Sequence, residues 1–188
     1  MRHFFGIRDE EFIRGDVPMT KQEIRMAVMN EARVDEDSVI LDVGAGTGSI
    51  SIEAALGAPK GHVYAIERFD KGIELIQQNM EKFNVSNMTV IKAKAPEGME
   101  DLPELDAVII GGSAGQLGNI IDEAQRLLKI GGRLVVTAVT METGSAILKE
   151  MQRKYQKRNK DGIFIKKANG VSDDENAPIG LIDQVIKL

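Results

Sequence analysis

The chain has 188 residues, 43% of them hydrophobic and 28% charged, with a net charge of −5 and no cysteine. This predicts one domain over 1–188 and excludes disulfides, thiolate metal sites and a cysteine nucleophile, while two distant histidines make any metal site unexpected. The negative charge argues against nucleic-acid binding, and no apolar run reaches the roughly 18 residues that span a membrane, so we expect a cytoplasmic protein.

The first segment, 1–19, has no hydrophobic periodicity and ends near Val17-Pro18. Because proline biases the residue before it toward an extended conformation, we expect an arm that lies over the domain. The charged residues of this arm fit a plain solvated face equally well. The next residues, Thr20-Lys-Gln-Glu23, match a capping box, with Thr20 as the cap of a helix that runs to about Ala32.

An apolar run at 39–43 predicts a buried strand. Glycine follows at Gly44, Gly46 and Gly48, and a helical pattern covers 49–56. A strand, a glycine turn and a helix N-terminus in succession are typical of a nucleotide-type site. Gly44 is expected to adopt a positive φ, whereas Gly46 and Gly48 would let a ligand approach the backbone closely.

The remaining chain alternates predicted strands and helices. Strands are predicted at 62–66, 88–91, 105–110 and 133–139, and helices at 70–83, 117–128 and 142–155. Asp70 can cap the first of these helices, and Gly131-Gly132 is expected to end the second as a glycine C-cap. Two last strands, at 163–167 and 180–186, have no helix between them and favour an antiparallel pair. The order predicts an α/β fold with a doubly wound, mostly parallel sheet.

Ligands of such sheets bind at the carboxyl ends of the strands. The ends that matter here are 42–48, Glu67, 94–95 and 111–113. Glu67 lies about 20 residues beyond the last glycine, which is the spacing typical of an acid that accepts hydrogen bonds from ribose hydroxyls. An ordinary strand-end charge remains the alternative for Glu67.

The run Asp42-Val-Gly-Ala-Gly-Thr-Gly48 resembles motif I of the Rossmann-like methyltransferases that depend on S-adenosylmethionine (SAM). The run Leu127-Leu-Lys-Ile-Gly-Gly-Arg-Leu-Val135 resembles the junction between a helix and the fifth strand in the same superfamily. This resemblance implies a seven-stranded sheet with an antiparallel closing strand, and SAM as the cofactor.

A narrower resemblance covers most of the chain. Segments 6–13 and 17–25 are similar to the arm and first helix of the decarboxylating cobalt-precorrin methyltransferases, and 93–97, 108–115 and 137–143 continue the similarity. That family acts in anaerobic cobalamin synthesis, where it methylates the meso carbon between rings C and D and removes carbon dioxide from the ring-C acetate. The resemblance implies this reaction, a tetrapyrrole substrate and a homotetramer.

The family's cofactor contacts, carried over by position, fall on Thr20, Gly44, Ala45, Gly46, Thr47, Gly48, Glu67 and Ala95. Gly112 and Ser113 are expected near the substrate, although a tight strand-to-helix turn explains them nearly as well. Two positions depart from the family, because Glu67 is often Asp there and Lys94 stands where Asp is frequent. Since lysine cannot accept a hydrogen bond, we expect backbone groups near Ala95 to hold the adenine.

No residue stands out as a catalytic acid or base, and positioning can supply much of the acceleration for such chemistry. Arg8, Lys21, Arg25 and Arg68 are candidates to bind substrate carboxylates, and each fits a plain surface residue equally well. The resemblance places the arm at 1–19 over the cofactor. Two alternatives remain open: a protein-L-isoaspartate or other small-molecule methyltransferase, and a SAM-binding protein without catalysis.

Overall fold

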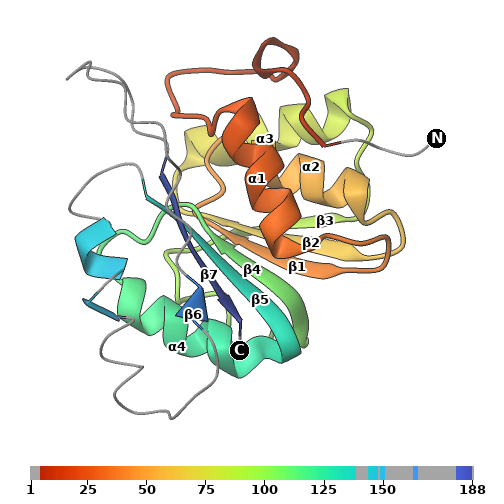
Figure 1. Ribbon diagram of the computed structural model, residues 1–188. Helices are drawn as coiled ribbons and strands as arrows, with labels where there is room; N and C mark the ends of the chain where they lie inside the picture. Colours follow the sequence, from red (N-terminus) through yellow and green to blue (C-terminus); the bar gives the residue numbers. More distant parts are fainter. Residues whose placement is uncertain (1–4, 139–143, 148, 151–162, 165–180, 188) are drawn as a thin grey trace.

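The computed structural model describes residues 5–138, 144–147, 149–150, 163–164 and 181–187 (Figure 1). Its helices are the short 3-10 helix η1 (Asp9–Glu11), α1 (Gln22–Ala32), α2 (Ser49–Gly57), α3 (Asp70–Lys82) and α4 (Leu117–Leu127). Its strands are β1 (Val39–Val43), β2 (His62–Glu67), β3 (Met88–Lys92), β4 (Leu105–Ile110), β5 (Leu128–Ala138), β6 (Ile163–Phe164) and β7 (Leu181–Lys187).

The strands form one sheet in the order β3-β2-β1-β4-β5-β7-β6. Strands β1 to β5 pair in parallel, and β7 pairs antiparallel with both β5 and β6. The predicted Rossmann-like arrangement is confirmed for the five parallel strands. Sheet growth reverses direction between β1 and β4, and this switch point is where ligands of doubly wound sheets bind.

Helices cover both faces of the sheet, with α1, α2 and α3 on one side and α4 on the other (Figure 1). Strand β1 shows how the core is divided, because Leu41 and Val43 pack in the cluster of α4 whereas Ile40 packs in the cluster of α1 and α2. Strands that are buried on both faces read as continuous apolar runs, which is why the sequence revealed them. Asp42 is the exception within β1 and is 1% exposed.

The capping box predicted at the start of α1 is wrong. The N-cap is Lys21, its backbone is extended, and no side chain caps the helix. The carbonyl oxygen of Thr20 instead accepts a hydrogen bond from Nη1 of Arg25. The backbone that leads into α1 is therefore held in place by the buried guanidinium of Arg25.

The glycine C-cap predicted at Gly131-Gly132 is also wrong. Helix α4 ends at Leu127, and Leu128 already has extended backbone angles and pairs with Leu105 of β4. The glycines lie inside β5, beside a register shift in its pairing with β4, where Gly131 has a φ of +84°. Since strand pairing begins directly after the helix, the glycines shape the start of a strand.

Other predicted boundaries differ by a few residues or lie outside the described part. Helix α3 begins at Asp70 with Phe69 as its N-cap, so Asp70 does not cap it. Of the helix predicted at 142–155, only 144–147 and 149–150 are described, and they are helical. Of the strand predicted at 163–167, the last three residues lie outside the described residues.

Candidate active site

The glycine turn joins the end of β1 to the neighbouring strands. Gly44 has a φ of +74°, and the amides of Gly44 and Ala45 both donate to the carbonyl oxygen of Ile66 in β2. A Cβ atom on Gly44 would lie 2.7 Å from backbone atoms of Gly112, at the end of β4. Glycine is therefore required at Gly44 both for the positive φ and for the close approach of two chain segments.

The other two turn glycines are packed against the protein itself. Gly48 is the N-cap of α2, and a Cβ atom there would lie 2.9 Å from the Ile76 side chain of α3. A Cβ atom on Gly46 would lie 3.4 Å from the carbonyl oxygen of Pro18 in the arm. Close approach of a ligand was predicted at both positions and stays a prediction; the close contacts that the structure shows are with the arm at Gly46 and with α3 at Gly48.

The carboxylate of Glu67 is held against this turn. It is 6% exposed, and its Oε2 accepts a hydrogen bond of 2.9 Å from the amide of Gly46. Its Oε1 accepts from the amides of Arg68 and Phe69, both at 2.8 Å. Because each carboxylate oxygen can accept two hydrogen bonds, these contacts leave one acceptor position on Oε2.

Two buried polar atoms beside the turn have no hydrogen-bond partner among the described residues: Oδ1 of Asp42 and Oγ1 of Thr47. The other oxygen of Asp42 accepts a hydrogen bond from the hydroxyl of Ser51, at 2.5 Å. Burial raises the pKa of Asp42 to about 6, the Ser51 hydrogen bond opposes this rise, and the charge of Glu67 adds to it. The turn thus carries unused hydrogen-bonding capacity.

A pocket opens at the carboxyl ends of the central strands, at the switch point. Its walls are residues that follow or end β1, β2, β3 and β4: Val43, Gly44, Ile66, Arg68, Ala93, Lys94, Ala95, Gly112, Ser113 and Ala114. Four predicted site residues, Gly44, Ala95, Gly112 and Ser113, therefore meet in one pocket. The other predicted cofactor residues, Thr20, Ala45, Gly46, Thr47, Gly48 and Glu67, are not part of these walls.

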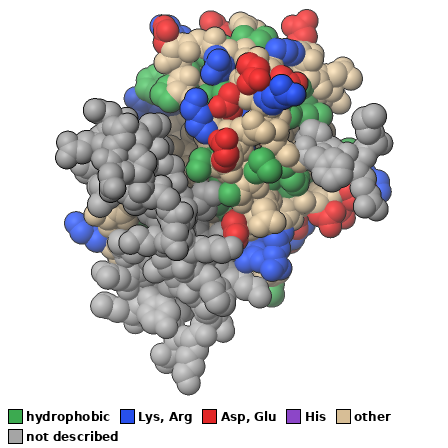
Figure 2. All heavy atoms as spheres, turned by 45° about the horizontal axis from the view of Figure 1, so that its top comes forward, with side chains coloured by type: hydrophobic (Ala, Val, Ile, Leu, Met, Phe, Trp, Pro, Cys, Tyr) green, Lys and Arg blue, Asp and Glu red, His purple; other side chains and the backbone are tan. Residues whose placement is uncertain are grey.

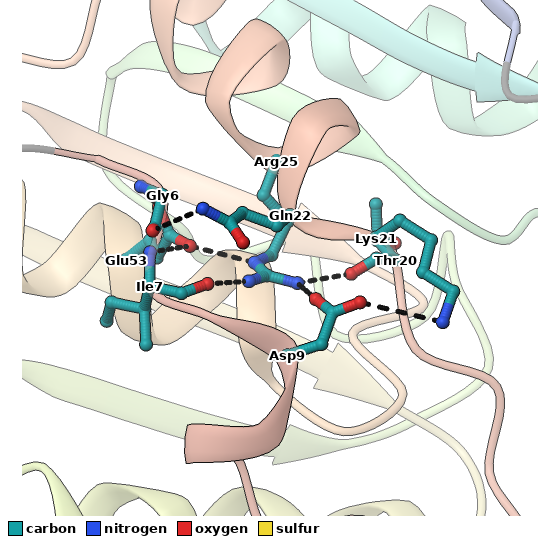
Figure 3. Close-up of polar contacts among 8 residues, drawn as sticks. All are labelled: Gly6, Ile7, Asp9, Thr20, Lys21, Gln22, Arg25 and Glu53. Atoms are coloured by element: carbon teal, nitrogen blue, oxygen red, sulfur yellow. Dashed lines mark hydrogen bonds and ion pairs between the residues drawn. The ribbon is translucent and has the colours of Figure 1, made fainter.

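The arm is fastened to the helical layer by Arg25, which is 0% exposed (Figure 3). Its Nε donates to Oε1 of Glu53 in α2 at 2.8 Å, and its Nη1 lies 2.7 Å from Oδ1 of Asp9. Its Nη2 donates to the carbonyl oxygen of Ile7, and the guanidinium lies 4.7 Å from the ring centre of Phe12. The interpretation of Arg25 as a substrate-binding cation is wrong, because its side chain is fully buried and all three guanidinium nitrogens donate to acceptors within the protein.

The other predicted substrate-binding cations have different surroundings. Lys21 lies 3.5 Å from Asp9, and Arg8 lies 3.8 Å from Glu10, in both cases near the arm surface. Burial works to raise the pKa of Asp9, but hydrogen bonds and charge from Arg25 and Lys21 outweigh it and lower that pKa. Arg68 lines the pocket and stacks on Phe69, with 4.3 Å to the ring centre.

Sequence reasoning missed Asn79, which is 0% exposed on α3. Its side-chain amide forms hydrogen bonds with the backbone of both Ile13 in the arm and Thr47 in the glycine turn. A signal was present in the sequence, because Asn79 lies three residues after Ile76 on the apolar side of the helix. A polar residue at such a position needs buried partners.

Within the described residues, no group of three or more His, Asp or Glu side chains is arranged to hold a metal ion. No helix in the described part of the chain combines the length and hydrophobicity that crossing a membrane requires.

Comparison with known proteins gives consistent results. The precorrin methyltransferase domain family matches residues 11–161. A protein of Sulfurisphaera tokodaii, named a probable cobalt-precorrin-6B C(15)-methyltransferase (decarboxylating), is 39% identical over 165 residues, which is 86% of this chain and 85% of that protein. The Salmonella typhimurium protein named as the same enzyme is 42% identical over 137 residues, covering 72% of this chain and 70% of the relative. The crystal structure of a precorrin-6Y C5,15-methyltransferase from Geobacter metallireducens matches with a TM-score of 0.79 and 38% identity, covering 89% of this chain and 86% of that one.

Proposed function

The chain belongs to the precorrin methyltransferase family, and we propose that it methylates the meso carbon between rings C and D of a late cobalt-precorrin and decarboxylates the ring-C acetate. The names of the relatives at 39% and 42% identity support this reaction. The observation that carries the proposal is the pocket at the carboxyl ends of β1 to β4, where the backbones of Gly44 and Gly112 are exposed and carry no side chain that would keep a flat macrocycle away from the wall.

The cofactor proposed for this site is SAM, which supplies an electrophilic methyl group on its sulfonium when bound. The turn fits such a ligand, because Asp42 and Thr47 keep buried polar atoms without partners among the described residues. The residues proposed to hold it are Thr20, Gly44, Ala45, Gly46, Thr47, Gly48, Glu67 and Ala95. Glu67 would offer the remaining acceptor position of its Oε2 to a ribose hydroxyl.

Two cations of the pocket are proposed to bind the carboxylates of the tetrapyrrole. Arg68 and Lys94 come from the ends of β2 and β3, and Gly112 and Ser113 face the same pocket from the end of β4. Arginine and lysine are the natural partners of carboxylates, so this wall would orient a polyacidic macrocycle over the glycines.

The chemistry proposed for the pocket relies on positioning. None of the described residues that line it is Asp, Glu or His, so no side chain there is an evident proton acceptor. In the decarboxylation, the bond between the ring-C CH2 group and its carboxylate breaks and carbon dioxide leaves. The electron pair passes into the conjugated macrocycle, and a proton from solvent completes the methyl group that remains on ring C.

Further parts of the proposal concern the whole protein. We propose one domain over 1–188, with the arm at 1–19 covering the cofactor, and a homotetramer as the family resemblance implies.

Figure 2 shows acidic and basic side chains interspersed on the viewed face, which supports a partner other than nucleic acid. A cytoplasmic location stays a prediction. Light scattering after size-exclusion chromatography tests the tetramer, and a monomer would overturn it.

Two experiments test the reaction. Calorimetry with SAM should show saturable binding to the native protein, and the absence of binding would overturn the cofactor proposal. Incubation with SAM and the cobalt-precorrin substrate, followed by mass spectrometry, should show a product that has gained a methyl group and lost carbon dioxide. Methylation of an isoaspartyl peptide would favour the protein-L-isoaspartate alternative, and binding without turnover of either compound would favour a non-catalytic protein.

A further inference from the structure

Asn79 joins three segments that are far apart in the sequence. Its Oδ1 accepts a hydrogen bond of 2.8 Å from the amide of Ile13, and its Nδ2 donates to the carbonyl oxygen of Ile13 at 3.1 Å. The same Nδ2 donates to the carbonyl oxygen of Thr47 at 3.0 Å. One buried amide on α3 therefore binds the arm and the glycine turn together.

The two segments that Asn79 connects also touch directly. Val17 and Pro18 of the arm lie against Gly46, within 3.4 to 3.7 Å of the position that a Cβ atom would take there. Thr47 follows Gly46 and immediately precedes Gly48, the N-cap of α2. The arm thus contacts the turn at Gly46, and Asn79 holds both segments by its hydrogen bonds to Ile13 of the arm and Thr47 of the turn.

We propose that Asn79 is a positioning residue that couples the order of the arm to the shape of the cofactor-binding glycine turn. This inference rests on the proposed function, since it assumes that the turn binds SAM. Only a primary amide offers one acceptor and two donors in a single plane, and Asn79 uses all three. An aspartate would lose both donors, and a serine is too short to span the two segments.

The chain offers a matched control in Asn87. Its Nδ2 donates to the carbonyl oxygens of Ala55 and Ala58, at 3.0 and 2.8 Å. Both acceptors of Asn87 lie at the C-terminal end of α2, so Asn87 holds this helix without contacting the arm or the turn, whereas Asn79 acts at the N-terminal end of α2 and binds both. A side chain that merely stabilises α2 would behave alike at both positions.

The test compares Asn79→Ser and Asn87→Ser with the wild type. We expect SAM to bind about tenfold more weakly to Asn79→Ser, whereas Asn87→Ser keeps its affinity within about twofold at a similar loss of Tm. Asn79→Asp should bind as weakly as Asn79→Ser. Hydrogen exchange should show that SAM slows exchange of the amides in segment 6–17 in the wild type and in Asn87→Ser, but not in Asn79→Ser.

The outcomes separate this inference from the proposed function. A wild type that does not bind SAM overturns the proposed function. If the wild type binds SAM, two results overturn the inference alone. One is that Asn79→Ser binds SAM with the affinity of the wild type. The other is that Asn79→Ser and Asn87→Ser lose the same amount of SAM affinity. Should the Asn79 variants fail to fold, exchange of the Ile13 amide in the wild type decides, because this amide donates to Asn79: exchange that SAM leaves unchanged overturns the coupling, and exchange that SAM slows supports it.

Discussion

Asp42 is a carboxyl group inside an otherwise apolar strand. It is 1% exposed, it lies close enough to the carboxylate of Glu67 to feel its charge, and its hydrogen bonds come from Ser51. Removing a carboxylate from water disfavours its charged form, and a nearby negative charge does so further. Its protonation is therefore linked to folding.

The free energy of unfolding should change with pH as the carboxyl group of Asp42 gains or loses its proton. Its pKa is about 6 in the folded protein against 3.8 ordinarily, so its stabilising contribution is complete below pH 3.8 and is lost as the pH rises through 6. Across that window the wild type should lose on the order of 3 kcal/mol of unfolding free energy relative to Asp42→Asn. Urea unfolding of both proteins at a series of pH values measures this difference. Parallel profiles would contradict it.

A second residue-scale prediction concerns Gly44. Gly44→Ala should abolish measurable SAM binding and destabilise the protein, because its Cβ atom would lie 2.7 Å from Gly112 backbone atoms at a φ of +74°. Gly131→Ala is the control, since Gly131 has a φ of +84° and nothing within 4 Å of a Cβ atom. The control should lose about 1 to 2 kcal/mol and bind SAM normally. Equal behaviour of the two variants would show that the contact with Gly112 is unimportant.

Lys94 allows a kinetic prediction about the substrate. Lys94→Ala should raise the KM for the cobalt-precorrin about fivefold with little change in kcat, because an electrostatic contact present in both ground and transition states is lost. Lys92→Ala is the control, since Lys92 is also exposed but forms an ion pair with Asp70 and is not part of the pocket wall. Steady-state assays would contradict the prediction if both variants kept the wild-type KM.

At the scale of elements, the arm, α1 and α2 are held together by one buried ion pair. Arg25 and Glu53 have fully buried side chains, and Glu53 also accepts hydrogen bonds from the amides of Gly6 and Ile7. Removing one member of a buried pair leaves an uncompensated charge, and this costs more than the pair contributes as a whole.

Arg25→Met should therefore lower the free energy of unfolding by about 3 to 5 kcal/mol. It should also expose the arm to limited proteolysis, because Asp9 and Ile7 lose their partner. The control is Lys60→Met, whose solvent-exposed pair with Glu36 should contribute little to stability. Urea unfolding and protease digestion measure both effects, and a loss below 1 kcal/mol in Arg25→Met would contradict the interpretation.

The elements differ in how well the sequence predicts them. Strands β1 and β4 and the second half of β5 were predictable because burial on both faces leaves apolar runs that local pattern reveals. The start of α1 and the end of α4 were not, because Arg25 at the start of α1 is held by Glu53 and Leu128 pairs with β4, and neither interaction is local.

The same reasoning applies to the candidate site. Gly44, Ala95, Gly112 and Ser113 meet in one pocket because parallel strands end at one edge of the sheet, a rule that needs only the strand order. The partners of Arg25 depend on how the arm crosses the helices, over separations of up to 28 residues, and no sequence pattern specifies that path.

For the whole molecule, a cofactor analogue should stabilise the fold. A ligand that binds only the folded state at one hundred times its Kd contributes about 2.7 kcal/mol. For a chain of 188 residues this corresponds to a rise in Tm of roughly 5 to 10 °C. Differential scanning calorimetry with S-adenosylhomocysteine measures this rise, and Gly44→Ala should show none. An unchanged Tm of the wild type at saturating ligand would contradict the prediction.

The contacts that Glu53 and Asn79 make with the arm also determine when the arm can dock during protein synthesis. The arm is translated first, but Glu53 follows Gly6 by 47 residues and Asn79 follows Ile13 by 66 residues. Contacts over such separations form only after both partners have left the ribosome, and they carry a large loop-closure entropy. A nascent chain therefore cannot complete the docking of its N-terminal segment until α3 has emerged.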